Sequence, residues 1–199
     1  PLNWEKSVKE LNCDYLVVGA GAAGCVVSNR LSHGLNNRVI CIEAGGKDTN
    51  FYIKIPAGFS KTVYNDKINW PYYTEETENT PNRKIRFPRG KVVGGSSSIN
   101  GHLYVRGQAV DYDGWAQKGC LGWSWADVLP YFMKAETRSE GDKNFRGNEG
   151  PLHISDLKSP HPLAKLFIQT AHSIGIKKNT DYNSGDQEGS FLYQTMIKN

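Results

Sequence analysis

The sequence lacks a hydrophobic run long enough to cross a membrane. Its longest stretch without a charged residue, Tyr15 to Asn29, holds three glycines within six positions, and a membrane helix needs about 20 mostly apolar residues. A basic segment followed by an apolar one, as in a secretory signal, is also missing. We therefore expect no transmembrane segment and a cytoplasmic protein, with peripheral membrane association left open. The chain starts with Pro1 rather than Met, so we expect its natural N-terminus to lie upstream.

The sequence has few cysteines, and their spacing shows no paired motif. The four cysteines form no C-x-x-C motif, and Cys25 and Cys41 fall in apolar segments. We expect reduced, buried thiols and no metal site, because disulfide and metal sites need closer or more regular spacing.

The sequence also has no excess of one charge. A net charge of +4 is spread over mixed Lys, Arg, Asp and Glu, which argues against a nucleic-acid-binding protein.

A strand, a helix and a second strand are predicted near the start. Residues 14–18 form a β-branched run that ends in glycine, residues 22–31 have the small and apolar residues of a helix, and residues 39–42 form a second apolar run. Both strands are expected to be buried. Within about 30 residues this order predicts a βαβ unit with parallel strands and a right-handed crossover, which places the chain in the α/β class.

The rest of the chain gives weaker signals, with no clear helix in the long aromatic segment 45–91 and no regular element in the glycine-rich segment 94–101. Ser124 is the expected N-cap of a helix over 125–136, although Pro130 favours a start nearer Leu129. Segment 191–197 is expected to be a strand whose partners come later in the chain. The remaining predictions are a lead-in helix in 1–12, a mobile loop over 140–150, a strand over 152–154 and a helix over 162–174.

The turn after the first strand has the spacing of a dinucleotide fingerprint. It reads Gly19-Ala-Gly21-Ala-Ala-Gly24, where the first glycine permits a tight turn, the second admits a pyrophosphate and the third allows close helix packing. Glu43 ends the second strand, where an acid accepts hydrogen bonds from the adenosine ribose. A glycine-rich packing turn without a ligand would not explain Glu43. We therefore predict nucleotide binding.

The choice between FAD and NAD depends on the residues after Glu43. The chain continues with Ala44-Gly45-Gly46 and a long aromatic stretch, instead of the next strand and helix of a nicotinamide-binding domain. A long aromatic cover suits a bulky, permanently bound cofactor better than one that exchanges in each turnover. This pattern favours FAD, with an NAD-dependent Rossmann dehydrogenase as an alternative.

A second glycine cluster identifies a family. The cluster reads Pro88-Arg-Gly-Lys-Val-Val-Gly-Gly-Ser-Ser-Ser-Ile-Asn-Gly-His-Leu-Tyr-Val-Arg-Gly107 and continues to Asp113. This segment resembles the first signature of the glucose–methanol–choline (GMC) oxidoreductases. Its sequence is close to that of choline dehydrogenase-like members. Shorter stretches agree, among them Ile55-Pro-Ala-Gly58, Gly122-Trp-Ser-Trp125 and Gly150-Pro-Leu-His153. A solvated Gly/Ser linker would not run directly into Leu103-Tyr-Val-Arg106.

The resemblance implies a set of FAD-contacting residues. Ser96, Asn100, Gly101 and Leu103 are expected to touch the cofactor, and Ala22 and Ala23 to line its pyrophosphate. Some members carry a histidine that is bonded covalently to the flavin; Ile99 stands at that position here, so FAD is expected to be bound without a covalent link. His102 is expected to line the site, whereas His153, His161 and His172 are expected to be structural or exposed. The full expected set is Gly19, Gly21, Ala22, Ala23, Gly24, Glu43, Ala44, Gly94, Gly95, Ser96, Asn100, Gly101, His102 and Leu103.

The same resemblance implies the reaction and the domains. A base removes the proton of a small-molecule alcohol, and hydride passes from the carbinol carbon to flavin N5. The family's catalytic histidine is expected beyond Asn199, so we assign no catalytic residue and expect a truncated chain, for which a non-catalytic flavin-binding fragment is an alternative. The substrate and the electron acceptor, oxygen or a quinone, stay open. We expect a lead-in at 1–12, a Rossmann-like FAD-binding domain at 13–150, with a flavin cover at 45–91 and the signature at 88–113, and the start of an α+β substrate-binding domain at 151–199.

Overall fold

The computed structural model describes residues 10–34 and 36–198, so most of the expected lead-in at 1–12 lies outside the described residues. The chain forms two compact units, one up to Gly101 and the other from His102 onward. The boundary between them falls inside the glycine-rich signature segment. The domain limits expected from the sequence stay predictions.

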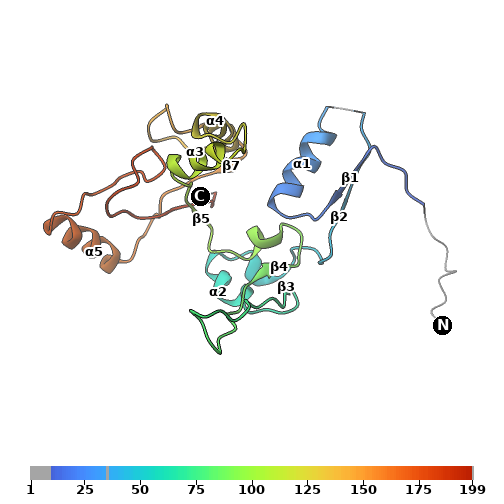
Figure 1. Cartoon of the computed structure of the whole chain (residues 1–199), viewed down its shortest axis with the longest axis horizontal. Helices are drawn as coiled ribbons and strands as arrows, with labels where there is room; N and C mark the ends of the chain where they lie inside the picture. The colour runs from blue at the N-terminus through green and yellow to red at the C-terminus, as the bar shows by residue number, and fades with distance from the viewer. Residues whose placement is uncertain (1–9, 35, 199) are drawn as a thin grey trace. The chain divides into compact units, whose positions relative to one another are not determined.

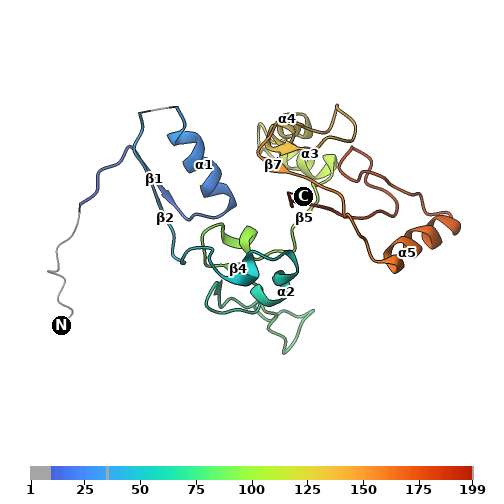
Figure 2. The same ribbon diagram turned by 180° about the vertical axis from the view of Figure 1, so that it is seen from behind.

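The first unit contains the predicted βαβ motif. β1 pairs with β2 in parallel, in a register that runs from Tyr15 opposite Val39 to Val18 opposite Ile42, and α1 packs beside both strands (Figures 1 and 2). The α/β prediction is confirmed. In chain order the elements are β1 (Tyr15–Val18), α1 (Ala22–Ser32), β2 (Val39–Ile42), η1 (Phe51–Ile53), η2 (Pro56–Gly58), α2 (Phe59–Thr62), β3 (Asn69–Trp70), β4 (Arg89–Gly90) and η3 (Gly95–Ser98).

The expected burial of the two strands is wrong for this chain. Leu16 is 57% exposed and Val18 77% exposed. A buried strand needs layers on both of its faces, whereas this sheet has two strands and one helix beside it. The cysteine prediction fails in part for the same reason. Cys25 and Cys41 are free, as expected, but both are exposed.

The core of the first unit lies in the segments that follow the βαβ motif. Val92 is fully buried and packs with Ile68 and Ile99. Two buried polar side chains support this cluster: the Thr62 hydroxyl donates to the Ile99 carbonyl at 3.2 Å, and Asn69 donates to the Thr62 carbonyl at 2.7 Å. Segment 45–91 is therefore more ordered than its sequence suggested, because it contains two 3₁₀ turns, the one-turn helix α2 and the antiparallel pair β3–β4. The expected irregular segment 94–101 contains the 3₁₀ helix η3.

The second unit combines helices with two small sheets. Its elements are β5 (Leu103–Tyr104), α3 (Ala109–Gln117), α4 (Trp125–Ala135), β6 (Glu136–Thr137), β7 (Leu152–His153), α5 (Pro162–Ser173) and β8 (Gln194–Thr195). The predicted strand near 152–154 and helix near 162–174 are confirmed. α3 was not predicted, although Gln108 and Asp111 form a capping box at its start. None of the described residues belongs to a helix with the length and apolar character needed to cross a membrane.

The expected start of α4 is confirmed: the helix begins at Trp125 despite Pro130, because Ser124 and Asp127 cap its N-terminus reciprocally. The expectation that the partners of segment 191–197 come later in the chain is wrong. β8 pairs antiparallel with β5, which comes before it in the chain, so its partner is not a later strand. The loop 140–150 is held at Arg146, which is 5% exposed and paired with Glu136; its expected mobility stays a prediction.

Candidate functional site

The two glycine-rich segments of the first unit meet side by side. The Gly94 amide donates to the Ala20 carbonyl at 2.7 Å, and Gly21 and Gly94 form a parallel bridge. A methyl group added at Gly95 would lie 2.9 Å from the Gly21 Cα, so a side chain at Gly95 would crowd this contact. Residues about 70 positions apart in the sequence therefore form one continuous backbone surface.

Each fingerprint glycine has a distinct environment. Gly19 has a φ of +94°, a left-handed conformation that favours glycine, and its amide donates to the Ile42 carbonyl at 2.7 Å. A Cβ on Gly24 would stand 1.9 Å from the Gly19 carbonyl oxygen, whereas one on Gly21 would meet no atom within 4 Å. Gly24 thus permits close packing between helix and turn, and Gly21 leaves space open beside the backbone.

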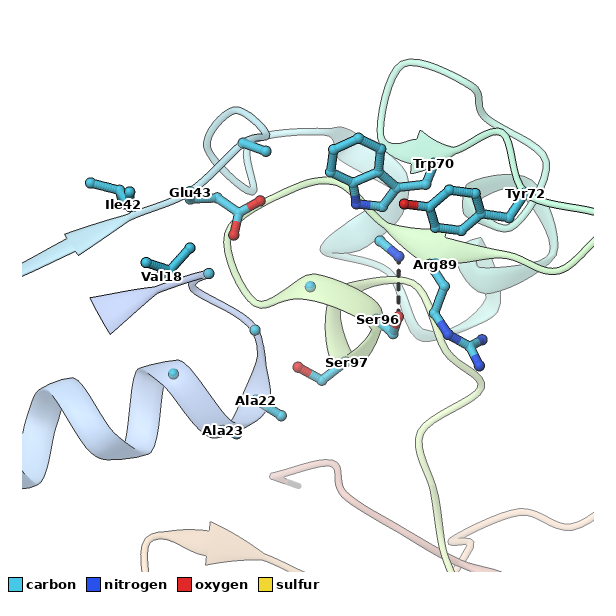
Figure 3. Close-up of a pocket in the computed structure, with 16 residues that line it drawn as sticks. Val18, Ala22, Ala23, Ile42, Glu43, Trp70, Tyr72, Arg89, Ser96 and Ser97 are labelled. Atoms are coloured by element: carbon cyan, nitrogen blue, oxygen red, sulfur yellow. Dashed lines mark hydrogen bonds between the residues drawn. The ribbon is translucent and has the colours of Figure 1, made fainter. Parts of the chain in front are cut away.

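A cavity of about 950 Å³ opens at this junction (Figure 3). α1 begins at its edge with Gly21 as N-cap and no side-chain cap, and the amides of a first helical turn have no partner within the helix. The cavity is lined by Val18, Gly19, Gly21, Ala22, Ala23, Gly24, Ile42, Glu43, Ala44, Trp70, Tyr72, Arg89, Gly90, Gly95, Ser96 and Ser97.

Glu43 places its carboxylate at the cavity wall by two backbone contacts. One oxygen accepts from the Ala20 amide at 2.8 Å and the other from the Gly45 amide at 2.9 Å. The bond from Ala20 joins the end of β2 to the fingerprint turn, whereas the bond from Gly45 is local to the segment after β2. A carboxylate has about four acceptor positions, so each oxygen keeps capacity for a further donor from the cavity. The only cationic side chain among the described lining residues is that of Arg89.

Two aromatic rings in the wall were not named in the sequence-based site. Trp70 and Tyr72 lie nearly parallel, with an interplanar angle of 3° and centroids 5.9 Å apart. The Lys91 ammonium sits 4.5 Å from the Trp70 centroid, so the ring is held from a second side. Sequence reasoning assigned the aromatic segment to a cover without choosing residues, because the β3–β4 pairing that directs these rings to the cavity is non-local.

The remaining expected site residues lie outside the cavity lining or in the other unit. Gly94 has a φ of +90° and supports the junction through its bond to Ala20. Asn100 and Gly101 follow η3 and are not among the described residues that line the cavity. His102 and Leu103 begin the second unit, where Leu103 opens β5. These four assignments stay predictions.

The three histidines expected to be structural or exposed occupy ordinary positions. His161 is the N-cap of α5, where its Nδ1 accepts from the Leu163 amide at 3.2 Å. His153 is exposed in β7, and His172 lies in the last turn of α5. Within residues 10–34 and 36–198, no three His, Cys, Asp or Glu side chains are grouped as metal ligands.

The chain matches a known family along almost its whole length. Residues 13–199 match the GMC oxidoreductase family. An "Oxygen-dependent choline dehydrogenase" from Rhizobium johnstonii is 42% identical over 187 residues, which are 94% of this chain and 34% of that protein.

Solved structures agree with this match. A pyridoxine 4-oxidase from Mesorbium loti has a TM-score of 0.87 at 33% identity and is matched over 94% of this chain and 37% of its own. An "FAD-dependent oxidoreductase" from Chaetomium thermophilum has a TM-score of 0.83 at 29% identity, over 94% and 34%. The chain spans about a third of the length of these relatives. On these matches, and on the junction of its two glycine segments, the chain belongs to the GMC oxidoreductase family.

Proposed function

We propose that the cavity of the first unit binds FAD. Its volume of about 950 Å³ lies in the upper part of the roughly 300–1,000 Å³ usual for ligand and cofactor sites. The observation that carries the proposal is the open space at Gly21 beside the uncapped start of α1. A helix N-terminus with free amides favours a phosphate, and a solved relative in this family is described as FAD-dependent.

The lining residues suit the parts of such a dinucleotide. We assign the pyrophosphate to the first-turn amides at Ala22 and Ala23, and an adenosine ribose hydroxyl to Glu43. The parallel rings of Trp70 and Tyr72 give a flat apolar surface against which a planar ring system can pack. Ser96 and Ser97 offer hydroxyls from η3.

FAD is proposed to be bound without a covalent link. Ile99 takes the position where some GMC enzymes carry a tethering histidine, and it is 3% exposed within the Ile68–Val92–Ile99 cluster. An aliphatic side chain in a core offers no atom for attachment. Acid precipitation of the flavin-loaded protein should therefore release the yellow colour into the supernatant. Colour retained in the washed pellet, and on a denaturing gel, would contradict the proposal.

Glu43 is expected to contribute to FAD affinity. A hydrogen bond from a hydroxyl to a carboxylate is worth about 1.5–3 kcal/mol, so Glu43→Ala should weaken FAD binding roughly ten- to a hundredfold. The measurement is flavin fluorescence during titration of the apoprotein with FAD.

Asp14 provides the matched control, because its carboxylate accepts from the Arg38 amide at 2.7 Å and so also joins β1 to β2, outside the cavity lining. Asp14→Ala removes a similar strand contact and should leave FAD affinity within about twofold. Equal losses in both variants would assign Glu43 a purely structural role.

For the whole protein we propose oxidation of a small alcohol. FAD, when bound, would supply the hydride acceptor for the carbinol carbon, and the residues of this chain would hold and orient it. The proposal is supported by the family match and by the similarity to a choline dehydrogenase. It is tested by dye reduction with the flavin-loaded, full-length protein and a panel of alcohols that includes choline. A yellow protein that oxidises none of them would keep the FAD proposal and reject the activity.

A further inference from the structure

One cationic side chain lines the cavity of the first unit without a carboxylate partner. Among the described lining residues, Arg89 is the only lysine or arginine and Glu43 the only acid. Within residues 10–34 and 36–198 Arg89 forms no ion pair, and Glu43 accepts from backbone amides instead. A cation at a cavity wall attracts negative charge in a ligand.

The guanidinium group of Arg89 is held by its own strand and the residues just before it. Its Cζ lies 3.8 Å from the ring centroid of Phe87, and its Nη1 donates to the Pro88 carbonyl at 2.8 Å. These contacts position the group without neutralising its charge. Because a guanidinium has five N–H donors and one is used here, most of them stay available to a ligand.

The backbone at Arg89 is fixed on both sides. β3 places Trp70 opposite Arg89 in the antiparallel pair. On the other side the Gly90 amide donates to Ser96 Oγ at 3.1 Å, and a Cβ on Gly90 would lie 2.2 Å from the Gly95 carbonyl oxygen. β4 therefore connects the aromatic wall with η3, and Arg89 has a defined place between them.

The lining residues follow one another in the order of the parts of FAD. Above, the adenosine ribose is assigned to Glu43 and the pyrophosphate to the start of α1 at Ala22. Figure 3 shows Ser97 and Ser96 between Ala22 and Arg89. Since the flavin is attached to the pyrophosphate on the side away from the adenosine, its ring falls beyond η3, on the side of Arg89.

We propose that Arg89 faces the flavin ring of FAD and stabilises its reduced form. The inference rests on the proposed function. Hydride transfer adds two electrons and one proton to a neutral ring, so the ring gains one negative charge, while the alcohol gives its hydroxyl proton to a base. A guanidinium beside the ring stabilises this anion more than the neutral ring. Arg89 thus raises the reduction potential of the cofactor.

The first test compares reduction potentials in the flavin-loaded, full-length protein. Arg89→Gln removes the charge, and Arg89→Lys keeps it. Arg83→Gln is the matched control, because it removes the same charge from an exposed residue of the first unit outside the cavity lining. The two-electron midpoint potential of each variant is measured by equilibration with a reference dye, so the readout does not depend on turnover.

We expect Arg89→Gln to weaken the binding of reduced FAD about tenfold more than that of oxidised FAD. For a two-electron couple this is a potential lower by about 30 mV. Arg89→Lys should retain most of the potential, and Arg83→Gln should leave it unchanged. An unchanged potential in Arg89→Gln, or an equal fall in Arg83→Gln, would overturn the proposal.

The second test uses ADP, which contains the adenosine and both phosphates without the flavin ring. Arg89→Gln should leave the affinity of the apoprotein for ADP within about twofold, as expected for independent sites, whereas Gly21→Ala should weaken ADP and FAD alike. Equal losses of ADP and FAD affinity in Arg89→Gln would assign Arg89 to the pyrophosphate and overturn the proposal. A wild-type protein that binds neither ADP nor FAD would instead reject the proposed function.

A further variant covers the case in which Arg89→Gln loses its flavin. Phe87→Leu removes the ring under the guanidinium and leaves the charge in place. It should lower the midpoint potential in the same direction by a smaller amount, because Arg89 is then less firmly positioned. An unchanged or raised potential in Phe87→Leu would in that case overturn the proposal.

Discussion

Expressed alone, residues 1–199 are expected to show no cooperative thermal transition and no alcohol oxidation above that of free flavin. Among the described residues only seven hydrophobic side chains are buried, whereas Leu16, Val18 and Val26 are each more than half exposed. Each large apolar side chain left in water forgoes about 1.5–3 kcal/mol. Against a usual net stability of about 5–15 kcal/mol, a few such losses prevent cooperative folding.

Catalysis is expected to fail independently. Our assignment gives these residues the cofactor and no base, and a positioned base typically contributes about a hundred- to ten-thousandfold in rate. Calorimetry and dye reduction with a panel of alcohols measure the two effects separately. A sharp transition together with turnover would contradict both and place the base among the five histidines of the chain.

The Leu16→Ala substitution tests whether the exposed face of β1 accounts for the expected lack of cooperative folding. Leu16 is 57% exposed here, so its truncation should leave the melting profile of the 199-residue chain unchanged. If the longer protein buries this side chain, the same substitution should destabilise it by about 2–5 kcal/mol. No effect in the longer protein would show that this strand face stays in water there as well.

Gly24→Ala is expected to abolish FAD binding by disrupting the fingerprint turn. The new methyl group would stand 1.9 Å from the Gly19 carbonyl oxygen, and because that atom belongs to the backbone, helix and turn must separate. Overpacking of this kind costs about 1–3 kcal/mol or more. Both the melting temperature of the full-length apoprotein and the flavin content of the purified protein should fall.

Gly21→Ala is the matched comparison for Gly24→Ala, because it changes the cavity without disturbing the packing of the turn. A methyl group there meets no protein atom within 4 Å, and Gly21 has a φ of −76° that alanine adopts freely. The apoprotein should keep its stability while FAD affinity falls about tenfold or more, because the methyl group takes the space assigned to the pyrophosphate. Gly46→Ala, which also meets no atom within 4 Å and does not line the cavity, should change neither quantity. Unchanged FAD affinity in Gly21→Ala would move the phosphate site elsewhere.

Local patterns in the sequence determined the elements that carry the fingerprint. A β-branched run, the glycine spacing and Glu43 at a strand end were enough to predict β1, α1 and β2 in parallel order, because short-range sterics and helix geometry fix this motif within about 30 residues. Ser124 likewise marked the start of α4 through a local hydrogen bond. Pro130, which favoured a later helix start, was a weaker indicator of the start of α4 than this cap.

Only the tertiary structure decided what depends on distant partners. The contact of Gly21 with Gly94 and Gly95, and the aromatic wall at Trp70 and Tyr72, arise from backbone pairing between segments that no periodicity connects. The partner of β8 was mistaken because strand pairing has no local signature, and the exposure of β1 was mistaken because burial is a property of neighbouring layers rather than of the strand. The buried charges of the second unit, Arg106, Glu136, Arg146 and Asp181, have the same origin. Arginines and carboxylates ordinarily indicate surface, and only the meeting of distant segments pairs them well enough to be buried.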